Sequence, residues 1–239
     1  MKDIVELEYG SEGLYQSKVI ARPTSMDAAL LGQPKSFYRD SGKRAFDIVM
    51  ATVLGILLLP VIFTLWVLVR LDGGHGFYSQ IRVGKNGQLF RCWKLRTMQM
   101  DADAALQRMC DENPEIASEW YENQKLERDP RITRIGRILR ATSMDELPQI
   151  LNILLGHMSL VGPRPFIDNQ AGLYDRAGGF SYYTVRPGIT GTWQVFGRGH
   201  TSFVDRVKYD TLYCRDISIW KDLFLMYKTL GVVLRRTGT

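Results

Sequence analysis

The sequence has few of the residues that build disulfide frameworks and metal centres. It contains three cysteines and three histidines in 239 residues. The cysteines Cys92, Cys110 and Cys214 are odd in number and far apart, which excludes a disulfide framework and a zinc-binding spacing. With so few histidines, a histidine-based metal site is not expected. This cysteine usage indicates that the polar part of the chain faces the reducing cytosol.

Several common signatures are also missing. The chain has no Walker loop, no GxGxxG fingerprint and no apolar core of a signal peptide near its N-terminus. Its hydrophobic content of 45% is ordinary for a globular protein and too low for a polytopic membrane protein. Lysine plus arginine is 31 and aspartate plus glutamate is 25, without a basic run. This modest excess suits a partner with phosphates: nucleic acid, anionic lipid or a nucleotide.

One long apolar segment is present. Residues 48–69 are 22 residues without a charge, and as a helix they would be about 33 Å long, close to the ~30 Å hydrocarbon core of a bilayer. Pro60 interrupts the segment and basic residues flank both ends, which favours a segment that enters the bilayer, bends and returns to the same face. A straight span and a buried core helix remain alternatives. Asp47, at its start, is expected to pair with Lys43 or Arg44.

A second candidate for membrane contact lies near the C-terminus. In residues 218–236, apolar and aromatic side chains recur at helical spacing, and basic residues fall mostly elsewhere on the helical wheel. The pattern predicts an amphipathic helix that lies among lipid headgroups. An amphipathic helix packed on the protein's own core is an equal alternative.

The polar part of the chain predicts short strands mixed with helices. Residues 77–98 are predicted to form a β-hairpin with an Asn-Gly turn at Asn86 and Gly87. Because side chains alternate along a strand, Lys94 and Arg96 share one face. This pair of cations could meet a phosphate, or it could simply be solvated.

The next segment is predicted to be helical. Residues 99–128 are acidic and show no site, and a short basic helix follows them. The basic helix places four arginines at three-residue spacing along one side: Arg131, Arg134, Arg137 and Arg140. Arg140 is five residues from Asp145 and close enough to share its site. Since strands and helices do not alternate regularly, we expect an α+β fold.

The most informative stretch is residues 142–165. Asp145 and Glu146 precede a short apolar helix, which we expect to begin at or just after Asp145, with Pro148 in its first turn and Gly156 as its stop. The acids could merely complement the positive end of that helix. Alternatively, one ionised carboxylate could attack phosphorus while its neighbour holds a divalent cation, for which oxygen ligands favour magnesium.

Arg164 strengthens the chemical interpretation. Prolines on both sides restrict its backbone, so the loop can aim the guanidinium at two phosphate oxygens, although a tight turn with an exposed arginine is an alternative. A glycine-rich loop at residues 186–194 could host a base or a sugar by stacking on Trp193, or it could be a chain reversal. Asp210 is a further acid whose role the pattern leaves open.

In this order, the motifs resemble those of the monotopic phosphoglycosyl transferases, a family of bacterial sugar transferases. The resemblance covers roughly residues 41–236. It is carried by residues 43–47, 93–98, 129–133, 143–149, 158–165 and 186–191. The chain is most similar to the undecaprenyl-phosphate galactosephosphotransferases that begin exopolysaccharide synthesis. This resemblance implies a location at the cytoplasmic face of the bacterial inner membrane.

The resemblance also implies a two-step reaction. Asp145 would attack the β-phosphorus of a UDP-sugar of galactose or glucose type, releasing UMP and leaving a phosphosugar on the enzyme. Undecaprenyl phosphate would then accept the phosphosugar. Glu146 would help to bind Mg²⁺. The residues implied to contact phosphates or to lie in the polar site are Lys94, Arg140, Arg164 and Asp210.

The implied membrane segment is a re-entrant helix-break-helix hairpin, broken at Pro60, with both ends cytoplasmic. Family members usually carry serine before this proline, whereas this chain has Leu59, and Thr64 is the nearest substitute hydroxyl. The rest is expected to be a cytosolic helical domain with a β-hairpin and amphipathic interfacial helices. The predicted parts are a loosely ordered leader over residues 1–40, a membrane-inserted segment over residues 41–72 and a catalytic domain over residues 73–239.

Two other functions belong to different classes. An inactive membrane-tethered scaffold for polysaccharide assembly is disfavoured because the acidic pair and its expected cations are intact. A nucleic-acid-binding module is disfavoured by scattered charge and by the apolar segment. The expected partners are a UDP-sugar, undecaprenyl phosphate and membrane lipid, and not nucleic acid; a homo-oligomer and the identity of the sugar stay open.

Overall fold

The computed structural model describes residues 36–123, 126–199 and 201–234. Residues 1–35 of the predicted leader lie outside the described residues. The elements, in chain order, are η1 (Tyr38–Gly42), α2 (Lys43–Leu71), β1 (Phe77–Val83), η2 (Lys85–Gly87), β2 (Leu89–Leu95), α3 (Ala102–Glu112), α4 (Pro114–Asn123), α5 (Arg134–Thr142), η3 (Met144–Glu146), α6 (Gln149–Leu154), β3 (Ser159–Val161), η4 (Asp168–Gln170), α7 (Ala171–Arg176), η5 (Gly179–Thr184), β4 (Gly188–Thr190), α8 (Thr192–Phe196), α9 (Arg206–Arg215) and α10 (Ile219–Leu234).

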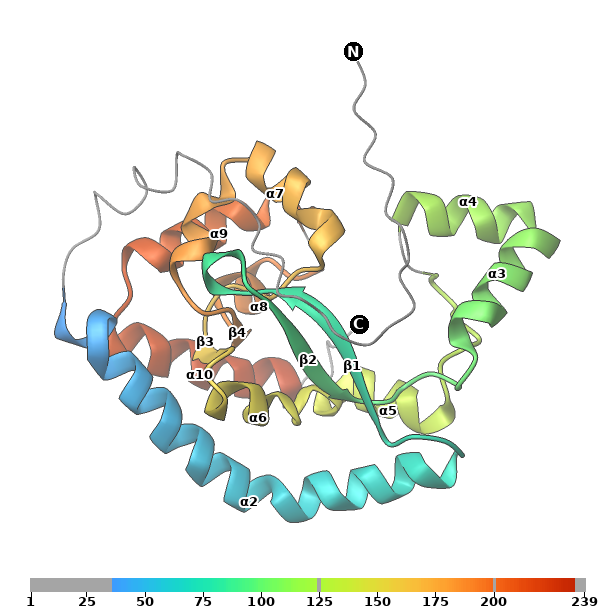
Figure 1. Cartoon of the computed structure of the whole chain (residues 1–239), viewed down its shortest axis with the longest axis horizontal. Helices are drawn as coiled ribbons and strands as arrows, with labels where there is room; N and C mark the ends of the chain where they lie inside the picture. The colour runs from blue at the N-terminus through green and yellow to red at the C-terminus, as the bar shows by residue number, and fades with distance from the viewer. Residues whose placement is uncertain (1–35, 124–125, 200, 235–239) are drawn as a thin grey trace.

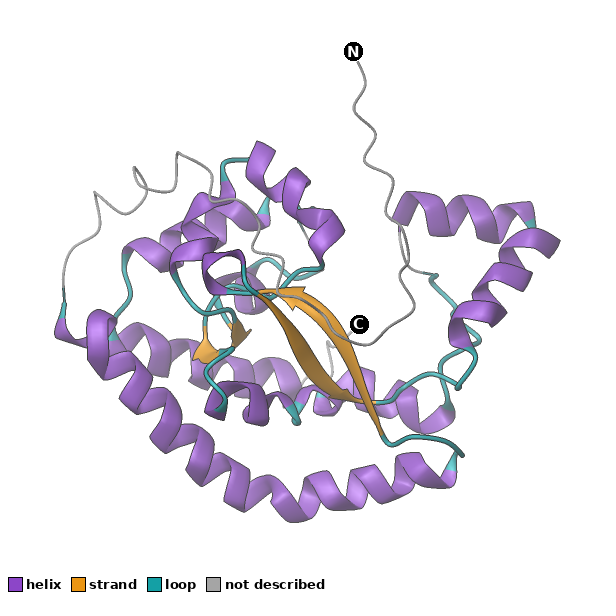
Figure 2. Ribbon diagram, viewed as in Figure 1, coloured by secondary structure: helices purple, strands orange, loops and turns teal. Residues whose placement is uncertain are grey.

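Helices surround two small sheets. α2 forms one edge of the molecule, and the hairpin of β1 and β2 crosses the centre (Figure 1). β3 and β4 pair in parallel in a second two-stranded sheet, and most of the remaining elements are helices (Figure 2). This helix-rich mixture with small sheets belongs to the expected α+β class.

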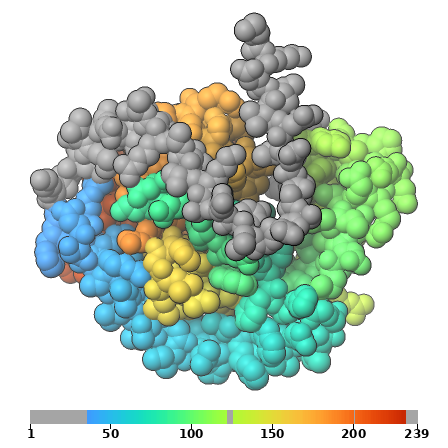
Figure 3. Space-filling view, viewed as in Figure 1, coloured from blue at the N-terminus to red at the C-terminus, as the bar shows by residue number. Residues whose placement is uncertain are grey.

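α2 keeps its apolar surface exposed. The helical stretch Tyr38–Leu71 is 34 residues long, and only 6% of its most apolar 18-residue window is buried. Among the described residues, it is the one helix long and apolar enough to cross a membrane. The space-filling view shows it along the lower edge of the molecule with its outer side uncovered (Figure 3). A core helix would be covered by other elements, so the alternative of a buried core helix is wrong, and the exposed surface indicates contact with lipid.

The helix continues through Pro60. α2 is one helix across this residue, and it curves around the body of the molecule (Figure 1). Pro60 has no N–H to donate to the carbonyl of Ile56. The hydroxyl of Thr64 donates a hydrogen bond to the carbonyl of Pro60 at 2.9 Å. Such a contact favours bending of the helix, but it does not replace the missing bond to the carbonyl of Ile56. The helix-break-helix hairpin is therefore not confirmed, and the arrangement in the membrane stays a prediction.

The first turns of α2 are fixed to the body of the protein. Asp47 is 1% exposed, and its Oδ1 accepts hydrogen bonds from Ser159 Oγ at 2.9 Å and from the Leu160 N–H at 3.0 Å. Arg44 donates to the last carbonyls of α6. The expected pairing of Asp47 with Lys43 or Arg44 is wrong, because Asp47 faces β3 and the two cations face other elements.

Lys43 belongs to a buried cluster around Asp222. The carboxylate of Asp222 is completely buried and accepts hydrogen bonds from Lys43 Nζ at 2.6 Å and Tyr38 OH at 2.7 Å. It also accepts one from Tyr213 OH at 2.8 Å. The cluster joins η1 and the start of α2 to α9 and α10, and so fixes the apolar helix relative to the rest of the fold.

The predicted β-hairpin is confirmed. β1 and β2 are antiparallel, with Phe77 opposite Leu95 at the open end. At the turn, Asn86 and Gly87 adopt left-handed φ angles of 58° and 74°. Asparagine and glycine tolerate this conformation better than other residues, so the Asn-Gly signal located the turn correctly.

The two cations expected on one strand face have different partners. Lys94 lies in β2 and turns toward the acidic pair. Arg96 follows the strand, is 8% exposed, and donates to the carbonyls of Val69 and Gly73 around the end of α2. Neither alternative for the pair describes Arg96, which is not solvated and whose positive charge complements the C-terminal end of α2.

Of residues 99–128, predicted to be helical, Ala102–Glu112 and Pro114–Asn123 are confirmed as α3 and α4, which project from the body (Figure 1). Residues 124–125 of this segment lie outside the described part of the chain. Arg131 precedes α5 and pairs with Asp129, with Nη2 2.7 Å from Oδ2. Its guanidinium also lies 5.3 Å from the ring centroid of Trp120. Arg131 is therefore not part of the predicted cationic ridge, which begins with the helix itself.

α10 combines both alternatives considered for the C-terminal helix. Asp222 and Leu225 are buried on its inner side, whereas Trp220, Tyr227 and Leu230 are 79%, 71% and 64% exposed. One face packs on the core, and the aromatic face stays uncovered. Such a face is suited to the headgroup region of a membrane.

Candidate active site

The acidic pair lies in a tight turn between α5 and α6. α5 begins after Thr133, whose hydroxyl accepts a hydrogen bond from the Gly136 N–H at 3.0 Å. It ends at Ser143, whose φ of 56° is left-handed. This conformation is uncommon outside glycine, and such strain is often found at functional sites. Asp145 and Glu146 follow at once in the 3₁₀ turn η3.

α6 begins later than the sequence predicts. Its first residue is Gln149, and Pro148 is its N-cap. The expected start at or just after Asp145 is wrong, because Asp145 and Glu146 belong to the 3₁₀ turn η3 and Pro148 stands immediately before the helix. Gly156, with a φ of 86°, ends this segment as predicted. The acids therefore do more than complement the end of a helix, since their partners lie on distant segments.

Two cations hold the acidic pair. Lys94 Nζ, from β2, lies 2.7 Å from Glu146 Oε1 and 3.3 Å from Asp145 Oδ2. Arg164 Nη2, from the loop after β3, lies 2.8 Å from the same oxygen of Glu146. Glu146 is thus shared by two cations, whereas Asp145 has one longer contact. The alternative of a tight turn with an exposed arginine does not describe Arg164.

These unequal contacts separate the two carboxyl groups. Burial raises the pKa of Asp145, and the charge of Lys94 offsets this only in part. Burial also disfavours the charged form of Glu146, but Arg164 and Lys94 outweigh it and hold the pKa of Glu146 well below its usual range. Glu146 is therefore the firmly ionised member, and Asp145 carries the more basic carboxylate.

Arg140 lies close to Asp145 without bonding to it in the described contacts. Its Nε donates to Thr97 Oγ1 at 2.9 Å. Burial lowers the pKa of Arg140, and the negative charge of Asp145 opposes this change. The guanidinium of Arg140 therefore lies near the acidic pair, as the position of Arg140 in the sequence predicts.

Asp210 is connected to the acidic pair through other residues. It is 2% exposed and accepts a hydrogen bond from Tyr174 OH at 2.5 Å. Burial raises the pKa of Asp210 to about 6, against the opposing effects of Arg206 and Tyr174. Arg206 donates in turn to the backbone carbonyl of Arg164. Asp210 is therefore linked to Arg164 through Arg206, and its predicted role in the polar site stays a prediction.

Two arginines that the sequence analysis missed also face the site. Arg82, from β1, donates to the carbonyl of Pro165 at 3.3 Å. Burial and the neighbouring charge of Arg164 lower the pKa of Arg82 and of Arg198, and Glu146 attracts both. Neither arginine stands in an acidic or proline-bounded motif that would mark it. The positive charge around the two carboxylates exceeds their negative charge, which suits a ligand with several phosphate charges.

The glycine-rich loop forms β4 and α8. Trp193, in α8, donates from Nε1 to Thr201 Oγ1 at 2.8 Å, and the guanidinium of Arg206 lies 4.7 Å from its ring centroid. One face of the indole is thus covered by a cation from the protein itself. Stacking of a base or a sugar on Trp193 stays a prediction, and that face is not available for it.

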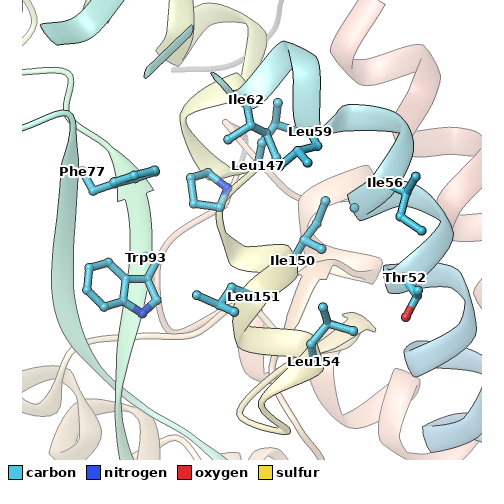
Figure 4. Close-up of a pocket in the computed structure, with 12 residues that line it drawn as sticks. Thr52, Ile56, Leu59, Ile62, Phe77, Trp93, Leu147, Ile150, Leu151 and Leu154 are labelled. Carbon is cyan, nitrogen blue, oxygen red and sulfur yellow. The ribbon is translucent and has the colours of Figure 1, made fainter. Parts of the chain in front are cut away.

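An apolar cavity of about 570 Å³ lies beside the acidic pair (Figure 4). Leu147 and Pro148, which directly follow Glu146, form part of its wall. α2 contributes the opposite wall, and the hairpin contributes Trp93. The side chains from α2 that point into it are Thr52, Ile56, Leu59 and Ile62. The apolar helix and the two residues that directly follow the acidic pair therefore line one cavity.

Asp145 and Glu146 are the oxygen donors that this site offers to a cation. Among the described residues, no group of three His, Cys, Asp or Glu side chains is arranged to hold a metal ion. Mg²⁺ is commonly held by one or two carboxylates together with substrate phosphates. The acidic pair fits that arrangement. Since Lys94 and Arg164 already contact Glu146, such an ion depends on phosphates from the ligand.

The chain is similar in sequence to known proteins. The sequence profile of the bacterial sugar transferase family matches residues 38–236. The chain is 43% identical over 198 residues to the exopolysaccharide production protein ExoY of Rhizobium meliloti, covering 82% of this chain and 87% of that relative. The chain therefore belongs to the bacterial sugar transferase family, which confirms the resemblance.

Two further relatives carry more specific names. The chain is 45% identical over 197 residues to the UDP-galactose-lipid carrier transferase of Erwinia amylovora. It is 43% identical over 197 residues to the undecaprenyl-phosphate galactose phosphotransferase of Salmonella typhimurium. Both alignments cover 82% of this chain and 41% of the relative, so the chain spans less than half the length of these two proteins.

Proposed function

We propose that this protein is a membrane-bound phosphoglycosyl transferase. It moves a hexose-1-phosphate from a UDP-sugar to undecaprenyl phosphate at the cytoplasmic face of the bacterial inner membrane, as the first membrane step of exopolysaccharide synthesis. One observation carries the proposal: a buried carboxylate, Asp145, lies among cations that suit phosphates and beside an apolar cavity lined by the exposed helix α2. This juxtaposition suits a reaction between a charged nucleotide sugar and a lipid.

In the first step, an oxygen of Asp145 attacks the β-phosphorus of the UDP-sugar. The bond between that phosphorus and the bridging oxygen breaks, and UMP leaves with the electron pair. The product is an aspartyl-phosphosugar, a mixed anhydride of the carboxylate and the sugar phosphate. Lys94 and Arg164 neutralise the phosphate oxygens, and the raised pKa of Asp145 makes its carboxylate the better nucleophile of the pair.

In the second step, a phosphate oxygen of undecaprenyl phosphate attacks the same phosphorus. The bond from phosphorus to Asp145 breaks, which restores the carboxylate and gives the lipid-linked diphosphate sugar. Because the carboxylate is both the nucleophile of the first step and the leaving group of the second, no external base is required for either displacement. UMP must leave before the lipid phosphate occupies the same cationic surroundings.

The apolar cavity supports a lipid as the acceptor. Its walls are almost entirely apolar side chains from α2, the hairpin and α6, and they include the two residues that follow Glu146. An isoprenoid chain in this cavity would place its phosphate next to the acidic pair. The re-entrant arrangement of α2, with both ends cytoplasmic, fits this direction of approach, and the uncovered aromatic face of α10 suits the headgroup region.

Mg²⁺, held by Glu146 and the phosphates of the donor, would stabilise the negative charge that develops on departing UMP. Arg140 and Asp210 are proposed to support the same polar site, Arg140 beside Asp145 and Asp210 through Arg206. For the sugar, relatives named for galactose are 41–45% identical to this chain, whereas relatives named for UDP-glucose are 36% and 38% identical. This comparison favours galactose.

An inactive scaffold for polysaccharide assembly is the second candidate. A scaffold has no need for a buried acidic pair whose two members are held at different pKa values by two cations. The test is turnover. Purified protein in undecaprenyl phosphate micelles is expected to release UMP from one member of a panel of UDP-sugars and to form a lipid-linked diphosphate sugar. Absence of UMP with every donor would favour the scaffold.

A further inference from the structure

The loop that carries Arg164 is held by its carbonyl groups. Pro163 O accepts a hydrogen bond from the Gly188 N–H at 2.8 Å, and Phe166 O accepts one from the Val83 N–H at 2.9 Å. Between them, the carbonyl of Arg164 accepts from Arg206, and that of Pro165 accepts from Arg82. Four consecutive carbonyls are therefore fixed by three different segments, β1, β4 and α9. Prolines at positions 163 and 165 have no N–H, so the carbonyls are the main polar groups by which this loop can be held.

Close backbone packing brings the loop to these donors. Gly162, just before the loop, donates to Thr190 O at 2.8 Å. A Cβ on Gly188 would lie 2.1 Å from the nitrogen of Gly162, and a Cβ on Gly162 would lie 2.5 Å from Arg186 O. Only glycine fits at both positions. The two-stranded sheet of β3 and β4 therefore sets the start of the loop, and the two guanidiniums act on the part that carries Arg164.

Arg206 occupies an unusual position for a residue that binds one neutral carbonyl. It is 5% exposed, and its guanidinium lies 4.7 Å from the ring centroid of Trp193 and 5.1 Å from that of Phe203. Its counter-charge is Asp210, which is itself held by Tyr174. A buried charge is unfavourable unless it is compensated, and a neutral donor would satisfy a carbonyl. The guanidinium of Arg206 is rigid, planar and stacked on aromatic rings. It can therefore fix the orientation of the loop, which a flexible neutral donor would not do.

We propose that Arg206 is a positioning residue for the transfer reaction, assisted by Arg82 and charge-balanced by Asp210. By fixing the carbonyls of residues 164 and 165, these arginines hold the guanidinium of Arg164 against Glu146 and so set where the donor phosphates lie. This inference rests on the proposed function for its kinetic consequence. Its structural consequence, a rigid loop, can be measured independently of turnover.

Arg206→Gln and Arg206→Lys test the proposal, with Arg215→Gln as the matched control. Arg215 is on the same helix, and its side chain is 71% exposed. With active sites counted by covalent loading, kcat/KM for the UDP-sugar is expected to fall roughly 10- to 100-fold in both Arg206 variants, because small displacements of positioning groups have effects of this size. Arg215→Gln is expected to match the wild type. Lysine keeps the charge but cannot stack and bond at once, so it should not rescue activity.

A double-mutant cycle separates positioning from general destabilisation. In an Arg164→Lys background, Arg206→Gln is expected to have less than about one third of its effect on kcat/KM, since both residues act through one guanidinium. Equal effects in the two backgrounds would overturn the proposal. Amide hydrogen exchange of residues 160–168 supplies the second readout. It should become faster in Arg206→Gln and Arg82→Gln but not in Arg215→Gln. Unchanged amide hydrogen exchange in the Arg206 and Arg82 variants would overturn the inference, whether or not the protein turns over a UDP-sugar. Missing turnover alone would overturn only the proposed function.

Discussion

Lys94 Nζ lies 2.7 Å from Glu146 Oε1 and joins residues that are 52 positions apart. The contact brings the hairpin to the acidic turn and neutralises Glu146 together with Arg164. Asp145, the immediate neighbour of Glu146, receives only a 3.3 Å contact from the same amine. The adjacent carboxyl groups thus have different pKa values, because Arg164 and Lys94 both act on Glu146 at short range whereas burial dominates at Asp145. This difference suits them to different chemistry.

The first prediction concerns this division of roles. Asp145→Asn is expected to lower turnover by roughly 10³-fold or more, because an amide cannot form the acyl phosphate. It should also abolish labelling of the protein by a UDP-sugar carrying radioactive β-phosphate. Asp103→Asn, an exposed acid on α3, is the control and should be labelled normally. Labelling of the Asp145 variant would move the nucleophile to another residue.

The second prediction is a pH dependence. Asp145 must be ionised to attack, and its pKa is raised, so kcat/KM should fall on the acid side at a pH above the ordinary value for aspartate, about 3.9. In Lys94→Gln the cation that lowers this pKa is gone, so the acid limb should move to higher pH. The pH profile of UMP release measures the limb. A limb that stays in place or moves to lower pH would contradict the role of Lys94.

The third prediction concerns the metal. The acidic pair is expected to hold Mg²⁺ only together with donor phosphates, so EDTA should remove activity and added MgCl₂ should restore it. Mg²⁺ without the nucleotide sugar should leave the thermal unfolding temperature nearly unchanged, because Lys94 and Arg164 already compensate Glu146. Full turnover in chelator would remove the metal from the mechanism.

Local patterns in the sequence identified local structure. The Asn86-Gly87 turn, the acidic helices and the Gly156 stop all depend on conformational preferences of a few neighbouring residues. Contacts between distant segments depend on packing and were identified only in part. Lys94 and Arg164 were assigned to phosphates because motifs of a known family carry them, and the structure brings both to Glu146.

The same limit explains the errors. Asp47 has Lys43 and Arg44 as its nearest charges along the chain, yet the orientation of α2 turns it toward β3. Arg82 and Arg206 donate hydrogen bonds to backbone carbonyls. Because every residue has such a carbonyl, the residue types in the sequence do not indicate these contacts. The cavity arises from three segments whose apolar residues each suit an ordinary core or membrane surface. Sequence patterns indicate which residues are apolar or charged, and the fold decides which of them meet.

The fourth prediction tests the contact that fixes α2. Asp47→Ala removes the acceptor of the Leu160 N–H, and leaving this buried donor unpaired is expected to destabilise the protein by about 1–3 kcal/mol. Ser159 Oγ can still donate to the carbonyl of Val161. Asp47→Asn keeps an acceptor oxygen and should lose less. Asp40→Ala, at an exposed position of η1, is the control. Denaturant unfolding in detergent gives the free energies, and equal stability of Asp47→Ala and the control would show that the contact does not fix the helix.

The fifth prediction concerns the path of α2 through the membrane. Ser41 and Asp72 flank the helix and are exposed, whereas Cys92 and Cys214 are buried, so single cysteines at 41 or 72 in a Cys110→Ser background can be labelled selectively. If α2 is re-entrant, an impermeant maleimide should label neither position in intact cells and both in inside-out vesicles. A straight span would instead expose one position in each preparation.

The same assay identifies what sets the re-entrant path. Pro60→Ala restores a donor for the carbonyl of Ile56, so it should straighten α2 and expose one flank to the periplasm in part of the molecules. Leu59→Ser leaves the proline in place and should label as the parent does. If Pro60→Ala also labels as the parent does, the proline is not the cause. The path would then be imposed by the buried anchors Asp47 and Asp222, which hold the start of the helix against the body whatever its curvature.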